Sequence, residues 1–532
     1  MISVSEAWEK KQRERLAPEG FVELSYLISE NGLQEEATAA SNDQTVFSDL
    51  DSITVPSGDR VYPRFATMEL NQWILDGSAE IVPDNGPYEN AGYVSSSFCD
   101  DGDPSLTINL TQIHTQVIQG ITILWSTEYE EYPTRFRVSA YRGGLLNGSI
   151  TVEGNQSTTS TVYMDIQNYD SVVIQALDWC LPSRRARIEQ VVLGIYVTYT
   201  KGDLISFSHE QTGCLVSGEL PKNAITFALD NSTGVWNPLN PDGNVKYLAE
   251  RQQIKVRYGF DIDGSIEWVK AGTFYLSEWS TPANGITATF TARDMLEFAI
   301  DVPYTGIRSG TLYDIISAAI AETELPLGAQ VYIDPHLKAF QTDFSANEQD
   351  FTLAEIIQMA ANAGTCVIHQ DREGVLRIER VSSPLSGYDI TENVSYAYPE
   401  VSLSKPLKAV TVSYGENVNF TRTVGTAGET QTVDNPLITN LTVARNVADW
   451  VSTVLSERQT ISGQYRADPR LDICDKIAVD SKYGVSNAVI ITNIKYEFTG
   501  AFKGTFTGRV SKFDPVPAYY SGERYAGELL WI

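Results

Sequence analysis

Short alternating strands between residues 64 and 199 constrain the fold of this chain more than any other feature of the sequence. Apolar and polar residues alternate through segments such as 106–110, 121–125 and 136–141, which is the pattern of strands that are buried on one face. Glycine and asparagine pairs mark the turns between them, and no long helical pattern interrupts the series. Short strands at such regular spacing predict a β-sandwich.

Two more regions are also predicted to consist mainly of strands. Residues 202–298 contain alternating segments separated by Asp-Gly turns, and this pattern predicts a β-barrel. Strands return after Val401, with one helical pattern near 440–458 and a polar stretch at 415–434 that is rich in threonine and glycine. That composition indicates a mobile loop, or one that a partner orders.

The residues from 300 to 385 have a mixed helical and strand pattern. Thr311 and Thr352 each begin a capping box ahead of apolar helical periodicity. The second of these helices is predicted over residues 353–363, and a hairpin follows with its turn at 371–374. This part of the chain is therefore expected to form a compact α/β module.

At 532 residues the chain is too long for one hydrophobic core. It opens with a charged helix after Ser5 that has little to bury by itself and is expected to dock on a neighbour. The predicted class is mainly β and multidomain. The expected divisions are an N-terminal helix (1–20), a β-sandwich (64–199), a β-barrel (200–299), the α/β module (300–385), a further mainly β region with one helix (386–512) and a C-terminal docking tail (513–532).

The net charge of −29 argues against binding to nucleic acid, because such binding requires clustered lysine and arginine to neutralise phosphates. An acidic surface can still serve DNA by repelling it, as the wall of a conduit would. The alternative is that the charge only keeps a large assembly soluble.

No catalytic or metal-binding motif is present among those that local sequence reveals. The chain has no G-x-S-x-G, P-loop, H-E-x-x-H or G-x-G-x-x-G pattern, its five cysteines form no C-x-x-C pair, and its four histidines are isolated. Isolated histidines are typical of polar or turn positions. We therefore expect no enzymatic activity and no required cofactor.

Asp100, Asp101 and Asp103 are the exception, because they bring carboxylate oxygens together at the close spacing that calcium sites use. A solvated loop is the alternative interpretation of this cluster.

No apolar run approaches the roughly 18 residues of a membrane span. The charged N-terminal segment also lacks the pattern of a signal peptide. The five scattered cysteines indicate no disulfide framework, which fits assembly in a reducing cytoplasm.

The predicted sandwich resembles discoidin (coagulation factor 5/8 C-type) domains in the order and spacing of its segments. The segments that carry this resemblance are 66–77, 93–97, 106–110, 121–125 and 133–136. The resemblance implies a β-sandwich whose end loops bind glycans or lipid head groups. Aromatic faces stack on sugars and arginine donates paired hydrogen bonds. The candidate ligand-binding residues are therefore Trp73, Tyr93, Tyr129, Tyr132, Tyr141 and Arg142. The alternative is a spacer that binds no ligand.

Most of the remaining sequence resembles phage and prophage tail hub proteins, the family of late-control proteins and the N-terminal part of tail-associated lysins. The segments that carry the resemblance are 204–210, 217–222, 225–231, 236–238, 248–259, 272–276 and 291–294, followed by 435–438, 465–470, 475–477, 490–496 and 500–508. The resemblance implies two hub β-barrels in each chain. The first would be a discontinuous barrel at 21–63 and 200–299 with the sandwich at 64–199 inserted into it, and the second would be a barrel with one helix at 386–512.

That family implies a homotrimeric baseplate hub that joins the tail tube to the tip and lines the DNA conduit. The implied partners are tail tube and distal tail proteins, tail fibre or tip proteins, and a host surface glycan at the inserted sandwich. The implied location is the tail tip of a virion assembled in the host cytoplasm, and a bacteriocin particle would suit the chain equally well. The alternative function is a glycan-binding adhesin that presents the discoidin-like sandwich.

Overall fold

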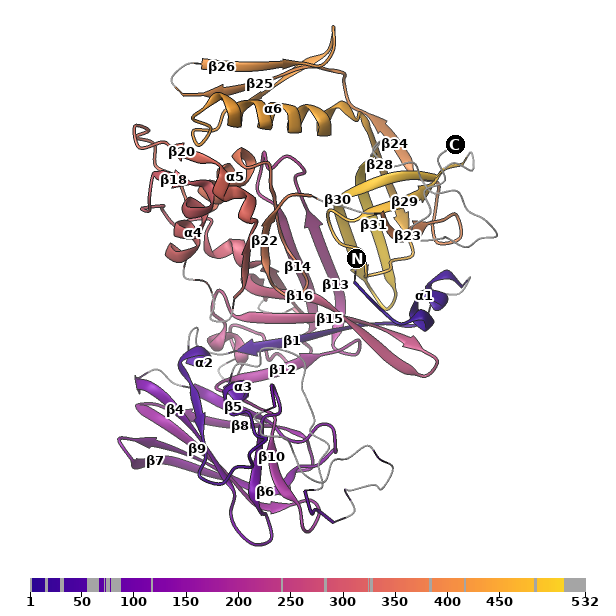
Figure 1. The fold of residues 1–532 in the computed structure, drawn as a ribbon. Helices are drawn as coiled ribbons and strands as arrows, with labels where there is room; N and C mark the ends of the chain where they lie inside the picture. The colour runs from indigo at the N-terminus through magenta and orange to yellow at the C-terminus, as the bar shows by residue number, and fades with distance from the viewer. Residues whose placement is uncertain are drawn as a thin grey trace.

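The computed structural model describes residues 2–14, 18–28, 33–54, 67–70, 72, 77, 88–115, 118–240, 243–281, 285–323, 325, 329–381, 385–415, 418–482 and 486–510. The described chain is mainly β and contains three hydrophobic cores. Figure 1 shows the three parts of the structure that are built around these cores, with the sandwich at one end and the part that contains helices α4 (Leu312–Glu322), α5 (Leu353–Ala363) and α6 (Leu441–Ser456) at the other.

One sheet of thirteen strands forms the largest body. The strands that we call the first β module follow in the order β12 (Ile195–Tyr199), β1 (Gly20–Ile28), β15 (Gln253–Ile262), β16 (Ser265–Ser280), β17 (Thr287–Arg293), β14 (Lys222–Asp230) and β13 (Leu204–Thr212). The second β module continues the order with β30 (Ser486–Phe498), β31 (Phe502–Val510), β28 (Gln459–Tyr465) and β24 (Glu400–Leu403). Two further strands branch from it: β29 (Lys476–Asp480) pairs with β30, and β23 (Leu385–Ile390) pairs with β29.

The two modules join where β13 pairs with β30 along six residues, from Phe207 opposite Phe498 to Thr212 opposite Asn493. A single core runs beneath both modules. The sequence predicted two barrels here. Among the described strands the pairings form one open ladder, and none closes either module into a ring.

The N-terminal helix docks on the first β module, as expected. Helix α1 (Glu6–Arg13) begins at Ser5, whose hydroxyl accepts a hydrogen bond from the Trp8 main-chain N–H at 3.1 Å. Trp8 is fully buried and meets the Phe260 ring edge-on, with 5.0 Å between ring centroids. One aromatic side chain therefore supplies the apolar contact of an otherwise charged helix. A short 3-10 helix, η1 (Asn244–Tyr247), lies in the β14–β15 connection.

The β-sandwich is an insertion between two neighbouring strands of the first β module. Ile28 and Ile195 are cross-strand partners at adjacent ends of β1 and β12, so the intervening chain leaves and re-enters the module at one place. Its five-stranded sheet is β2 (Thr38–Ala40), β4 (Ser105–His114), β9 (Tyr169–Trp179), β6 (Pro133–Arg142) and β7 (Leu145–Glu153). A second sheet contains β11 (Gln190–Val192), β5 (Ile118–Leu124) and β8 (Thr159–Ile166). A separate pair is formed by β10 (Arg185–Ile188) and β3 (Tyr93–Phe98), and two short helices, α2 (Leu33–Glu36) and α3 (Asp51–Thr54), complete the sandwich.

The sandwich begins earlier in the chain than residue 64, the boundary expected from the sequence. Leu33, Ala37 and Ile53 belong to its core, and β2 pairs with β4. The short segments before residue 55 carry too few alternating residues to reveal which sheet they join.

The third body is the expected α/β module enlarged by a later part of the chain. The predicted elements are α4 (Leu312–Glu322), which starts at the Thr311 capping box, α5 (Leu353–Ala363), which starts at the Thr352 capping box, and the hairpin of β21 (Val367–Gln370) and β22 (Leu376–Glu379). Its remaining small elements are η2 (Met295–Phe298), β18 (Ser309–Thr311), β19 (Val331–Ile333), η3 (Pro335–Ala339) and β20 (Gln341–Asp343).

The enlargement consists of helix α6 (Leu441–Ser456) and three strands, β26 (Val418–Thr423), β25 (Leu407–Tyr414) and β27 (Glu429–Val433). The sequence placed this helix in the second barrel. Val410, Val412 and Val447 instead share the core of the α/β module, because the apolar stripe of α6 and the buried face of β25 match each other. The polar stretch at 415–434, expected to be a loop, supplies β26 and β27 on either side of β25.

Candidate functional site

A cluster of buried polar side chains lies where the two β modules and the α/β module meet. We call it the joint, and it comprises Arg372, His209, Tyr258, Asn223, Tyr496, Asp468 and Arg470, together with the half-buried Asp472. Arg372 reaches it from the β21–β22 turn, where it is 4% exposed. The sequence marks this arginine only as part of the predicted turn at 371–374.

The guanidinium of Arg372 crosses from the α/β module into the second β module. It donates hydrogen bonds to the main-chain carbonyls of Pro469 and Leu471, and its Nε lies 3.4 Å from Oδ2 of Asp472. The Tyr496 hydroxyl lies 2.8 Å from the same Leu471 carbonyl. Burial opposes the charge of Arg372, but the carboxylate of Asp472 keeps its pKa above the ordinary arginine value.

His209 brings the first β module into the joint. Its Nδ1 lies 2.7 Å from the Tyr258 hydroxyl and its Nε2 lies 2.8 Å from Oδ1 of Asn223. Complete burial, aided by the nearby positive charge of Arg372, lowers the pKa of His209 to about 4. The imidazole is therefore neutral at pH 7. This histidine is a buried core residue, whereas the sequence analysis interpreted it as polar or turn-forming.

The N-terminal helix is tied to the joint through Arg470. Its guanidinium forms a fully buried ion pair with Asp468, with Nη2 2.7 Å from Oδ2, and its Nη1 lies 2.9 Å from the Glu9 carboxylate. The sequence from Tyr465 to Arg470 is one of the segments that carried the resemblance to tail hub proteins. In the structure this segment is where helix α1, the second β module and the α/β module are connected.

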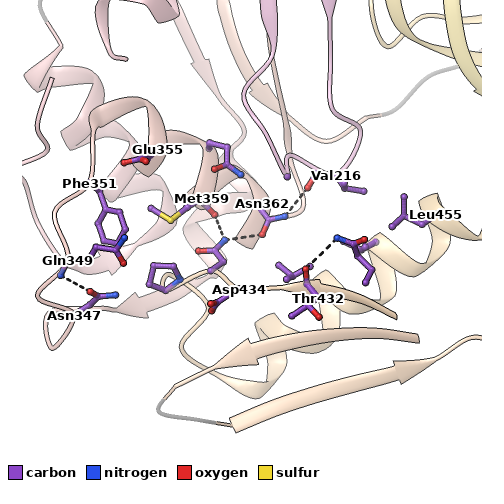
Figure 2. Close-up of a pocket in the computed structure, with 17 residues that line it drawn as sticks. Val216, Asn347, Gln349, Phe351, Glu355, Met359, Asn362, Thr432, Asp434 and Leu455 are labelled. Carbon is purple, nitrogen blue, oxygen red and sulfur yellow. Dashed lines mark hydrogen bonds between the residues drawn. The ribbon is translucent and has the colours of Figure 1, made fainter. Parts of the chain in front are cut away.

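A cleft of about 580 Å³ lies between the α/β module and the tip of the β13–β14 connection. Figure 2 shows Glu355, Met359 and Asn362 of α5 on one side, and Thr432 and Leu455 on the other. Several amides at its base already have protein partners. Asn435 Nδ2 donates to the Met359 carbonyl at 2.7 Å, and Asn362 Nδ2 donates to the Val216 carbonyl at 2.8 Å. The polar base therefore braces the α/β module against the first β module.

The ligand candidates of the sandwich lie in three different places. Tyr93 is 1% exposed and belongs to the core, so its ring is not available to a sugar. Tyr129 and Tyr132 are half-buried in the β5–β6 connection, and Tyr141 and Arg142 lie at the far end of β6. Ten strand residues at about 3.4 Å each separate these two pairs by about 30 Å. Trp73 lies outside the described residues.

Arginines that the sequence analysis missed surround the first of these two places. Arg184 Nε lies 2.8 Å from the Glu131 carboxylate, which also accepts a hydrogen bond from the Trp179 indole at 3.0 Å. Arg187 is paired with the buried carboxylate of Glu69 and lies 5.0 Å from the centroid of the Tyr129 ring. The Arg187 charge holds the pKa of Glu69 below its usual value despite burial. The signal in the sequence was the Arg-Arg-x-Arg run at 184–187.

The acidic cluster is exposed at Asp100, Asp101 and Asp103. Asp100 Oδ2 accepts a hydrogen bond from the Ser183 main-chain N–H at 2.5 Å. Among the described residues, no three histidine, cysteine, aspartate or glutamate side chains gather closely enough to hold a metal ion. Calcium binding at this loop stays a prediction.

In the part of the chain that the structure describes, none of the helices has both the length and the apolar character of a membrane span.

Comparisons with known proteins give likenesses to solved structures alone. No protein-family model matches the sequence, and no curated protein matches it. The 43 kDa tail protein of prophage MuSo2 from Shewanella oneidensis is 14% identical over 59% of this chain and 95% of that chain, with a TM-score of 0.42. A tail protein from Neisseria meningitidis MC58 is 13% identical over 59% and 93%, with a TM-score of 0.41.

The chain is also similar over 33% of its length to the family 32 CBM of NanJ from C. perfringens, which was solved in complex with galactose. That match covers 99% of the CBM at 17% identity, with a TM-score of 0.20. All three TM-scores lie below 0.5, so none of these likenesses decides the function of this chain.

Proposed function

We propose that the chain is a structural component of a phage tail or of a related tail-like particle, where it forms the hub of the baseplate. The observation that carries this proposal is the joint. The segment from Tyr465 to Arg470, which carries the sequence resemblance to tail hubs, binds the α/β module through Arg372 and helix α1 through Glu9. His209 of the first β module meets the second β module beside it, with 6.2 Å between the ring centroids of His209 and Tyr496. A part that transmits load between a tube and a tip requires such fixed connections between its modules.

In the particle, three copies form a ring that joins the tail tube to the tip and surrounds the DNA conduit. The net charge of −29 supports a conduit role, because an acidic wall repels DNA as it passes. The joint itself supplies positioning and no chemistry. Its histidine is neutral and its arginines are paired with carboxylates or carbonyls.

The inserted sandwich presents a glycan-binding surface at the periphery of this ring. Its separate core and single point of attachment at Ile28 and Ile195 suit a module that reaches outward. The end of the sandwich that contains Tyr129 and Tyr132 is the better candidate surface, because buried Arg184 and Arg187 hold the loops around it in place.

Electron cryomicroscopy of the native particle tests the hub proposal. We expect a threefold ring at the tail tip with an open channel and three peripheral sandwiches. Where the particle is not in hand, mass photometry of the purified chain with and without its tail tube provides the same test, because the tube is expected to promote the trimer.

A monomer that does not bind tail tubes but is retained on a glycan array would instead establish the adhesin alternative. On that array, Tyr129→Ala is expected to lower retention and Tyr141→Ala to leave it unchanged, since Tyr129 lies in the connection before β6 and Tyr141 lies at the far end of that strand. Equal losses would contradict the choice of the Tyr129 end.

A further inference from the structure

Along the strand order from β12 to β24, the large sheet ends differently at its two edges. At one end, β12 is covered by the sandwich, where the Tyr196 main-chain N–H donates to the Thr122 hydroxyl at 3.1 Å. At the other end, β24 pairs with β28 on one side only, as far as the described residues extend. All four residues of β24 are exposed. Figure 1 shows β24 beside β28 at the outer margin of the second β module.

The open edge of β24 presents both main-chain groups and apolar side chains. The Ser404 N–H donates to the Arg458 carbonyl, and hydrogen-bonded pairs alternate along an antiparallel ladder. The N–H and C=O groups of Val401 and Leu403 therefore point away from β28, toward the open side. Their side chains are 58% and 63% exposed. Val401 lies directly opposite the buried Ile461, so the apolar face of the sheet continues past its last covered residue.

An exposed apolar edge of this kind is a template for another strand. We propose that the C-terminal segment of the same chain, residues 528–532, adds to β24 as the next strand and covers Val401 and Leu403. This inference does not depend on the proposed hub function.

The position where the described chain stops supports this occupant. Arg509 lies opposite Thr460 of β28, and Thr460 lies opposite Ser402 of β24. The chain therefore leaves β31 in the same row of the sheet, three strand spacings or about 14 Å from the open side of β24. The 18 residues between Val510 and Leu529 can span up to about 60 Å, so the segment has ample length to reach the edge.

The composition of the segment matches the surface that it would cover. Leu529, Leu530, Trp531 and Ile532 are consecutive. Successive residues of a strand face opposite sides, so either register places two large apolar side chains over Val401 and Leu403. Pro515 and Pro517 precede it, where missing N–H groups suit a connection that crosses the sheet rather than a paired strand.

Hydrogen exchange of the full chain tests the proposal, with Leu530→Asp/Trp531→Asp as the variant. The Val401 and Leu403 amides are expected to exchange about tenfold faster in the variant than in the wild type. The Ser402 amide is the internal control, because it points toward β28 and should change far less. Equal exchange at Val401 and Leu403 in the two proteins would overturn the proposal.

A second measurement distinguishes docking within one chain from exchange between copies. Leu403→Cys/Leu529→Cys is oxidised with oxidised glutathione in a mixture of ¹⁴N- and ¹⁵N-labelled protein, and the linked peptides are identified by mass spectrometry. Peptides linked within one isotope support the proposal. Mixed-isotope peptides, or no linked peptide, contradict it.

Discussion

Arg372 of the α/β module donates a hydrogen bond to the main-chain carbonyl of Pro469 in the second β module. A turn residue of one module thereby satisfies a buried carbonyl of another, and a charge that is 4% exposed is balanced by Asp472 at 3.4 Å. Loss of Arg372 while the modules stay packed would leave the Pro469 carbonyl unpaired in a buried site.

Removal of this arginine should therefore be costly. Arg372→Met removes the partner of the Pro469 carbonyl and the cation beside the Asp472 carboxylate, while the Leu471 carbonyl keeps the Tyr496 hydroxyl. We expect it to lower the free energy of unfolding by about 3–5 kcal/mol. Urea denaturation followed by tryptophan fluorescence measures the change. Arg377→Met is the matched control, because Arg377 pairs with Asp371 on the same hairpin while 34% exposed, and its loss should cost less than about 1 kcal/mol. Similar losses in the two variants would contradict the role of Arg372.

His209 should make stability fall in acid. Its folded-state pKa of about 4 lies below the ordinary value of 6.5, so the unfolded chain takes up the proton first. The contribution is complete above about pH 6.5 and is lost as the pH falls toward 4, by about 3 kcal/mol in all. Denaturation between pH 4 and pH 8 measures this slope. His209→Gln should flatten it relative to the wild type, whereas His336→Gln, made in the half-buried η3 helix, should keep it.

Asp294 should have the opposite dependence. It caps η2 by accepting the Leu296 N–H at 3.1 Å, and its burial raises the pKa of the carboxyl to about 7. The folded state thus holds the proton more tightly than the unfolded state does. Its stabilising effect is present at low pH and is lost as the pH rises from about 4 through 7, by up to about 4 kcal/mol.

Asp294→Asn keeps an oxygen for the cap and removes the charge. We expect this variant to be more stable than the wild type at pH 8, and the difference to shrink steadily as the pH is lowered toward 4. Thermal unfolding at a series of pH values measures it. A difference that stays constant with pH would contradict the raised pKa of Asp294.

The capping box of α5 should be worth about 1 kcal/mol. Thr352 accepts the Glu355 N–H at 3.2 Å, and Glu355 accepts the Thr352 N–H at 2.8 Å. Thr352→Ala should lower the free energy of unfolding by that amount, and Thr352→Ser should largely restore it, because the serine hydroxyl accepts the same bond. If Thr352→Ser lowers the free energy of unfolding as much as Thr352→Ala does, the threonine methyl group rather than the hydroxyl cap is responsible for the stabilisation.

Local patterns foresaw the elements that depend on neighbouring residues. The capping boxes at Thr311 and Thr352 and the hairpin turn at 371–374 are recognisable from spacing alone. Helices α4 and α5 begin where these boxes predict, α5 ends before Gly364 as expected, and β21 and β22 form the predicted hairpin. The cap of each helix lies within three residues of its start, so a short window of sequence contains all the groups that determine it.

Assignments that depend on distant partners differed from the expectation. The stretch at 415–434 is polar enough to suggest a loop, yet Val418–Thr423 and Glu429–Val433 are strands because β25 supplies a pairing edge on each side. Tyr93 was a candidate for sugar stacking, but it is a core residue. The sequence of a strand does not show by itself which of its two faces is buried, so an aromatic residue in it can belong to either face.

The sequence by itself determined the mainly β class, the capped helices and the presence of a β-sandwich, because alternation, caps and turns are local properties of the chain. Only the tertiary structure decided that the two β modules form one sheet, and that Arg372, His209 and Arg470 meet in a joint. These residues lie up to 261 positions apart in the chain. The burial that sets their hydrogen bonds and pKa values arises only when strands from all parts of the chain pack together.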